Sequence, residues 1–202
     1  MKNKEQRTED EDAELVALCK KGDVDAFETF VRKYQKRMLN ISYRMLGSYE
    51  DACEVVQDAF VSAFKGMKNF EERARFSTWL YTIVINLSRN RLKQLEIKRH
   101  REESSLNDPV LTNNSQITIE PVSDDPSILE KLEKRDVQQK VQECIHALDN
   151  ESREMIVLRD IQAFSYDEIS DMLKIPEGTV KSRLFRARFA IKDCLKKVIG
   201  DL

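Results

Sequence analysis

The chain has 202 residues, which permits one or two domains that each bury a core of their own. Charged residues make up 35% of it and glycine occurs five times, a composition that favours an all-helical protein. The N-terminus is acidic and polar, so we do not expect a secretory signal peptide. The longest mostly apolar run, Trp79 to Ile85, is too short to span a bilayer, so we expect a cytoplasmic protein.

Charge is strongly segregated along the chain, although the net charge is only −2. Residues 73–101 carry eight basic residues and one acid, and residues 178–197 carry seven basic residues and one acid. Residues 102–136, between them, carry nine acids and three bases. Two basic segments separated by an acidic one predict two nucleic-acid contacts on a single chain.

The four cysteines, Cys19, Cys53, Cys144 and Cys194, lie far apart and form no Cys-x-x-Cys pair. Each falls in a helical pattern, where a free Cys is usually a small buried hydrophobe. We therefore expect four free thiols and a reducing compartment.

The first residues, 1–12, have the composition of a charged, disordered tail. A helix is predicted from about Ala13 to Lys21, where Gly22 stops it. A second helix is predicted after Asp23 and ends at Gly47. Its apolar residues recur at helical spacing: Phe27, Phe30, Val31, Tyr34, Met38, Ile41 and Met45.

Ser48 can cap a third helix, which Gly66 ends. One side of this helix matches the amphipathic template closely, with Ala52, Val55, Val56, Ala59, Phe60, Ala63 and Phe64. The other side, which we name the acidic face, comprises Asp51, Glu54, Gln57 and Asp58. Such a face is either simply solvated or docks a basic partner.

A polar loop over residues 67–75 precedes a fourth helix, predicted from about Ser77. Its inward residues are Leu80, Ile83, Val84 and Leu87. Its opposite side, the polar stripe, comprises Thr82, Asn86, Arg89 and Lys93, which can bond to base edges or phosphates. Neighbouring aromatics suit single-stranded DNA, because exposed bases stack on rings: Phe76, Trp79 and Tyr81. The alternative is that Phe76 and Trp79 are core residues.

Turn-forming residues interrupt the helical pattern after Arg101. We expect irregular or extended structure over residues 102–126 and helical periodicity again from near Ser127. The pattern restarts after Asp149 and Asn150, either of which can cap the next helix.

The end of the chain predicts a helix-turn-helix. Ser165 and Glu168 have capping-box spacing, so a short helix starts there; it ends near Lys174, and Pro176 opens a long basic helix. The inward side of the long helix comprises Val180, Leu184, Ala187, Ile191 and Leu195. Its outward side, the reading face, comprises Ser182, Phe185, Arg186 and Phe189, flanked by Lys181, Arg188, Thr179 and Arg183. Such a helix suits a DNA major groove; the alternative is a solvated surface helix.

Two sets of motifs resemble a known family. The chain resembles the second domain of bacterial sigma factors at Glu50–Ala52, Gln57–Phe60, Phe76–Tyr81 and Asn86. It resembles their fourth domain at Arg153, Leu158–Arg159, Ser165–Ile169 and Gly178–Arg188. Because no third domain lies between these segments, the chain resembles the extracytoplasmic-function (ECF) group of the sigma-70 family. It departs from the family pattern at Leu148–Asp149, where Leu-Pro is usual, and in the variable loop Glu71–Arg75.

The resemblance implies an all-α protein: a charged tail (1–14), two small helical domains (15–96 and 136–202) and an acidic linker (97–135). Such a protein binds core RNA polymerase through the clamp of its largest subunits and directs it to promoter DNA. The second domain melts the minus-ten element, and the fourth reads the minus-thirty-five element as duplex. An anti-sigma factor, usually membrane-anchored in this group, is a further implied partner. Neither a cofactor, a metal nor a small-molecule substrate is implied.

The resemblance also assigns roles to residues. The acidic face becomes the polymerase-docking surface. The polar stripe contacts minus-ten DNA, and the loop before it forms the pocket for a flipped-out base, with Asn69, Phe70, Arg73, Arg75 and Phe76. The minus-thirty-five base readers are Lys181, Ser182, Phe185 and Arg186. The phosphate contacts are Arg159, Thr179, Arg183 and Arg188.

Three other classes of protein fit the sequence less well. A helix-turn-helix regulator that does not replace a sigma subunit would need a receiver or ligand-binding domain, but residues 15–96 lack a receiver's alternating strands. An enzyme is not expected, because His100 and His146 have no Cys or acid at catalytic or metal spacing and no Gly-rich phosphate loop exists. A pure interaction protein, such as a sigma-binding regulator, would not need the basic reading helix.

Overall fold

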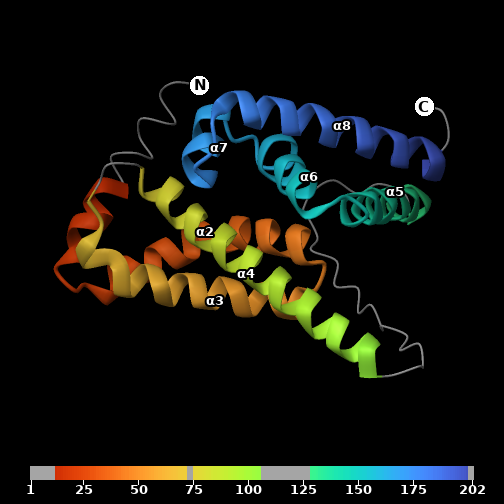
Figure 1. Ribbon diagram of the computed structural model, residues 1–202. Coiled ribbons are helices and arrows are strands. Elements are labelled where there is room, and N and C mark those ends of the chain that lie inside the picture. Colours follow the sequence, from red (N-terminus) through yellow and green to blue (C-terminus); the bar gives the residue numbers. More distant parts are fainter. Residues whose placement is uncertain (1–11, 72–74, 106–127, 200–202) are drawn as a thin grey trace. The chain divides into compact units, whose positions relative to one another are not determined.

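The computed structural model describes residues 12–71, 75–105 and 128–199, and every regular element in these ranges is helical (Figure 1). The prediction of an all-α fold is confirmed. The chain divides into two compact units, Met1–Leu106 and Asn107–Leu202. No described helix is long and apolar enough to cross a membrane.

The first unit contains a helix over residues 12–20, then α2 (Val24–Leu46), α3 (Tyr49–Gly66), the short 3₁₀ turn η1 (Met67–Asn69) and α4 (Phe76–Ser105). Its helix ends follow local chemistry. The Asp23 carboxylate accepts from the Ala26 N–H at 3.0 Å and starts α2. Gly47 ends α2 at φ 81°, a left-handed conformation that glycine adopts without strain. Ser48 then caps α3, so these predicted boundaries are confirmed.

Helices α2, α3 and α4 pack against one another around an aromatic core. The Phe76 ring stacks on Phe30 with centroids 4.0 Å apart, and Phe70 lies 4.9 Å from Trp79. The stacked and edge-on arrangements add to the free energy gained by burying these rings. Phe70 and Phe76, on either side of residues 71–75, therefore belong to the core, although the sequence between Met67 and Arg75 reads as polar.

The buried face of α4 is wider than predicted and rotated relative to the prediction. Leu80 and Val84 are buried as expected, but Ile83 and Leu87 are only half-buried. The face also includes Tyr81, Ile85 and Ser88. The reason is that α4 contacts both α2 and α3. The buried Ser88 hydroxyl is satisfied, since it donates to the Val84 carbonyl at 2.8 Å and lies 3.1 Å from the Ser42 hydroxyl.

Helix α4 continues through Ser105, so the prediction of irregular structure is wrong for residues 102–105. The sequence contains good helix formers and neither Gly nor Pro between Phe76 and Ser105. The turn-forming residues that suggested a boundary, such as Asp108 and Pro109, come after Ser105, so they do not end the helix at Arg101. Most of the expected linker, residues 106–127, lies outside the described residues.

The second unit contains α5 (Ile128–His146), α6 (Asn150–Met155), the π-helical η2 (Ile156–Ile161), α7 (Tyr166–Leu173) and α8 (Glu177–Ile199). Asp149 caps α6, and its carboxylate accepts from the Ser152 N–H at 2.9 Å. Burial disfavours the charged carboxylate, but hydrogen bonds from Ser152 and Glu151 outweigh that effect and lower the pKa of Asp149.

The helix-turn-helix forms as predicted. The capping box is complete, because the Glu168 N–H donates to the Ser165 hydroxyl at 3.1 Å and the Ser165 N–H donates to the Glu168 carboxylate at 2.8 Å. Lys174 ends α7 at φ 55°. Helix α8 packs against α5, α6 and α7. Its inward residues are buried at Val180, Leu184 and Ala187, and half-buried at Ile191 and Leu195.

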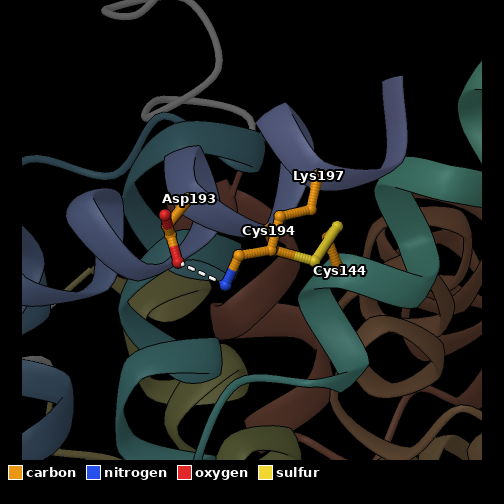
Figure 2. Close-up of a disulfide and its surroundings, with 4 residues drawn as sticks. All are labelled: Cys144, Asp193, Cys194 and Lys197. Carbon is orange, nitrogen blue, oxygen red and sulfur yellow. Dashed lines mark ion pairs between the residues drawn. A yellow bond between two sulfur atoms is a disulfide. The ribbon is translucent and has the colours of Figure 1, made fainter. Parts of the chain in front are cut away.

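A disulfide joins Cys144 of α5 to Cys194 of α8, with Cα atoms 5.7 Å apart (Figure 2). The expectation of four free thiols is therefore wrong: only Cys19 and Cys53 are free. The two bonded residues are separated by 50 positions, and their helices pack side by side. Helical periodicity placed each cysteine in a helix but could not say which helices pack together.

Candidate functional site

The acidic face of α3 is exposed at three of its four positions: Glu54, Gln57 and Asp58. Asp51 differs, because only 16% of its side chain is exposed. Arg91 of α4 donates from Nε to Asp51 Oδ1 at 2.7 Å and from Nη2 to Glu54 Oε2 at 2.9 Å. Its Nη2 also contacts Asp51. Three residues of the acidic face are thus open to solvent, whereas the Asp51 carboxylate is held by Arg91 of α4.

A hollow lies between α3 and α4 beside this guanidinium. Val55 and Leu87 give it an apolar floor, and its polar lining comprises Glu54, Asp58, Asn90, Arg91 and Gln94. The pKa of the Arg91 guanidinium is raised, chiefly by its hydrogen bond with Asp51. The negative charges of Glu54 and Asp58 raise it further. Two carboxylates face one guanidinium here, so the hollow is net anionic.

The polar stripe of α4 is partly available to a ligand. Asn86 and Lys93 are exposed, whereas Thr82 and Arg89 are half-buried. The Thr82 hydroxyl donates to the Thr78 carbonyl at 2.8 Å, as Thr often does inside a helix. The two exposed members of the stripe, Asn86 and Lys93, are therefore its strongest candidates for contacting nucleic acid.

Two aromatic residues predicted as base contacts before α4 are buried, so that part of the prediction is wrong. Phe70 and Phe76, predicted as base contacts, are only 7% and 5% exposed. Their rings lie in the aromatic core, which burial of apolar surface favours over exposure. Asn69 and Arg75 are exposed, and Arg73 lies outside the described residues.

The reading face of α8 is open. Phe185 and Phe189 are 74% and 71% exposed, and Ser182 and Arg186 are exposed beside them. The Ser182 hydroxyl donates to the Thr179 carbonyl at 3.1 Å. Within the described ranges, Arg186 has no ion-pair partner. Its guanidinium can therefore meet a ligand without first leaving another residue of the described part of the chain.

The residues flanking the reading face are engaged. Arg183 pairs with Glu151 at 3.2 Å, and Arg188 donates to Asp160 at 3.0 and 2.5 Å. Lys181 pairs with Glu177. Arg159 is half-buried; its guanidinium donates to the Phe164 carbonyl at 2.7 Å and lies over the Tyr166 ring. Thr179 is half-buried in the first turn of α8.

Sequence reasoning missed Arg91. It stands four residues after Leu87 and four before Leu95, both half-buried, so helical spacing places it on the side of α4 that faces the core. A basic residue at a core-facing position is a signal that a carboxylate lies opposite. That signal was present but could not identify Asp51, 40 residues away.

Comparison with known proteins agrees with this arrangement. The family model for sigma-70 region 2 matches residues 30–96, and the model for sigma-70 region 4 matches residues 138–190. The first match contains the acidic face and the polar stripe. The second contains the helix-turn-helix and the reading face.

Individual relatives match along most of their length. The ECF RNA polymerase sigma factor SigW of Bacillus subtilis is 34% identical over 187 residues, covering 93% of this chain and 96% of that protein. The RNA polymerase sigma-H factor of Pseudomonas aeruginosa is 30% identical over 194 residues, covering 96% and 98%. The structure of sigma factor RpoE from Bartonella quintana, solved with the anti-sigma factor NepR, matches with a TM-score of 0.61 at 25% identity and covers 84% of this chain and 96% of RpoE. The chain belongs to the ECF group of the sigma-70 family of RNA polymerase sigma factors.

Proposed function

We propose that the chain is a sigma subunit that binds core RNA polymerase and directs transcription initiation at specific promoters. The observation that carries the proposal is the exposure of two oppositely charged surfaces on two separate helical units: the acidic face and the reading face. An acidic surface attracts a basic protein partner, whereas a basic helix attracts the DNA backbone. A chain with both can connect the polymerase to its promoter.

In this proposal the acidic face docks on the clamp of the largest polymerase subunits. Glu54, Gln57 and Asp58 are exposed for direct contact, while Asp51 contributes through Arg91. Exposed acids add little to folding stability but set partner choice and association rate, which suits a docking surface.

The reading face contacts the minus-thirty-five element as duplex DNA. Arg186 and Ser182 can reach base edges, and Phe185 can pack against a thymine methyl group. Arg183 and Arg188 flank the face and contact phosphates. Each would exchange its present carboxylate partner, Glu151 or Asp160, for a phosphate. Lys181 likewise gives up Glu177 when it reads a base.

The polar stripe and the loop before it act on the separated strand of the minus-ten element. Asn86 and Lys93 are exposed for this contact, as are Asn69 and Arg75, while the buried rings of Phe70 and Phe76 support the loop. Asn86→Ala should reduce open-complex formation more than upstream duplex binding. Permanganate footprinting of a promoter measures this, and equal thymine reactivity in mutant and wild type would contradict the role.

The domains, 15–96 and 136–202, move independently, and limited proteolysis should cut between them and leave two stable fragments. The protein works in the cytoplasm, catalyses no reaction and has no small-molecule substrate. An anti-sigma factor, membrane-anchored or not, regulates it; the complex of Bartonella quintana RpoE with NepR supports this partner class.

Run-off transcription tests the central proposal. The purified chain should bind core polymerase and produce a transcript from a promoter that core enzyme alone does not use. The alternative, a helix-turn-helix regulator, would bind DNA without core polymerase and give a transcript only when another sigma subunit is added. Failure to bind core polymerase would refute the proposal.

A further inference from the structure

Arg91 connects the two helices that form the hollow beside the acidic face. Its guanidinium is held on one side by Asp51, through Nε at 2.7 Å, and on the other by Glu54, through Nη2 at 2.9 Å. Asp51 and Glu54 are three residues apart on α3, so a planar fork reaching from α4 can bond to both. The result is one cation shared by two acids.

The two acids bound by Arg91 differ in the exposure of their side chains. The Asp51 side chain is 16% exposed and forms the inner anchor of the guanidinium. The Glu54 side chain is 64% exposed. An exposed glutamate ordinarily samples many rotamers, and fixing such a side chain during association opposes binding. The bond from Arg91 restricts Glu54 before any partner arrives.

Arg91 does not neutralise the surface that it organises. Asp51, Glu54 and Asp58 supply three negative charges against one guanidinium, so the site stays net anionic. Glu54 and Asp58 both line the hollow, whose floor is apolar. An arginine or lysine side chain fits this chemistry, because its aliphatic stem can pack on Val55 and Leu87 while its charge meets the carboxylates.

We infer that Arg91 is a positioning residue for polymerase docking: it holds Glu54 in the orientation in which the hollow accepts a cationic side chain of the polymerase. The inference rests on the proposed function. It is separable from it, because the contact between Arg91 and Glu54 can be measured in the free protein and its effect can be measured on binding.

Replacing Arg91 distinguishes ordering of Glu54 from simple electrostatics, because the two predict opposite changes in the affinity for core polymerase. Arg91→Met removes a positive charge and makes the acidic face more negative. If the face acted only through its net charge, a basic partner would bind the variant more tightly. If Arg91 acts by ordering Glu54, the variant binds core polymerase more weakly, by about two- to tenfold, which corresponds to one side chain newly immobilised on binding.

A double-mutant cycle identifies the residue through which Arg91 acts. Dissociation constants for core polymerase are measured for Arg91→Met, Glu54→Gln and the double variant. We expect the double variant to bind no more weakly than Glu54→Gln alone, because Arg91 has no effect once the carboxylate is gone. Arg32→Met is the matched control: Arg32 pairs with Glu28 at 2.6 Å on α2, and its loss should leave binding unchanged.

Two results of the binding measurements, and one of NMR, would overturn the inference. Equal or tighter binding by Arg91→Met would show that order at Glu54 does not matter, and additive losses in the cycle would show that Arg91 contacts the polymerase itself. Arg91→Met leaves the Asp51 carboxylate without its guanidinium and could unfold the protein for that reason. In that case Asp51→Asn is compared with Asp51→Asn/Arg91→Met, because the neutral amide leaves no unpaired carboxylate.

NMR relaxation of the Glu54 side chain in the free protein should show increased motion in Arg91→Met. Unchanged motion would refute the positioning role even if wild-type protein failed to bind polymerase, a failure that refutes the proposed function separately.

Discussion

The acidic face of α3 and the reading face of α8 are both exposed and charged, but different interactions hold them. On α3, a guanidinium from the neighbouring helix binds two of the acids. On α8, a disulfide fixes the far half of the helix and the flanking arginines pair with carboxylates, while Arg186 in the centre is exposed. Exposure alone therefore does not tell which charges are available to a partner. On each face, some of the binding candidates must exchange an internal partner for an external one, as Arg183 and Arg188 do, whereas Arg186 need not.

The largest effect should follow from reversing a charge on the acidic face. Asp58→Arg places a cation where a basic partner is expected, and like charges across an interface cost several kcal/mol, so core polymerase binding should weaken on the order of 100-fold. Surface plasmon resonance on immobilised core enzyme measures this. Glu28→Arg, an exposed position on α2, is the control and should bind as wild type does. Wild-type affinity in Asp58→Arg would remove the acidic face from the docking surface.

The second-largest effect should follow from reducing the disulfide, which cross-links the second unit and not the first. Reduction of the disulfide should lower the free energy of unfolding of the second unit by about 2–4 kcal/mol, because the cross-link restricts the unfolded chain. Its Tm should fall on the order of 10 °C, and that of the first unit should not change. Calorimetry of the full chain with and without reductant tests this. Cys53→Ala, which removes a free thiol and keeps the disulfide, is the control and should respond to reductant as wild type does. A single transition unaffected by reductant would contradict the role of the bond.

The third effect distinguishes the centre of the reading face from its flank. Arg186→Ala should lose preference at particular minus-thirty-five positions, since an arginine bidentate to guanine contributes about 1–3 kcal/mol of discrimination. Arg183→Ala should weaken binding to all sequences alike and lower the salt slope by about one unit. Selection from randomised upstream elements measures both. If Arg183→Ala altered the preferred sequence and Arg186→Ala did not, the two roles would be reversed.

The smallest effect concerns the cap that positions α6 under α8. Asp149→Ala should lower the free energy of unfolding by about 1 kcal/mol. Because the folded state lowers the pKa of Asp149, its contribution is present above the unfolded pKa and is lost as the pH falls through the folded value. Asp149→Asn keeps the cap without a titrating group, so chemical denaturation should show a smaller loss of stability on acidification than in wild type. Identical acid profiles for the two proteins would exclude this contribution.

The parts of the fold that sequence predicts well are local. Asp23, Ser48 and the Ser165–Glu168 box act on amides three residues away, so their patterns contain the whole interaction. Gly47 is predictable for the same reason, because its left-handed conformation depends on the residue itself.

The features that sequence missed connect distant positions. Asp51 and Arg91 are 40 residues apart, and Cys144 and Cys194 are 50 apart. Periodicity places each of them on a helix face, but only helix packing decides which faces meet. Phe70 and Phe76 illustrate a different difficulty: an aromatic ring beside a basic stripe suits both base stacking and a core, and here the core of α2 and α4 takes the rings.

The disulfide also changes how the chain responds to force. It closes a covalent ring between Cys144 and Cys194, which contains α6, η2, α7 and the reading half of α8. A molecule pulled from its two ends cannot extend the 50-residue span inside that ring, which at roughly 3.3–3.6 Å per residue would otherwise contribute about 170 Å of contour length. In the oxidised protein, tension along the chain therefore bypasses the helix-turn-helix, whereas in the reduced protein it passes through it.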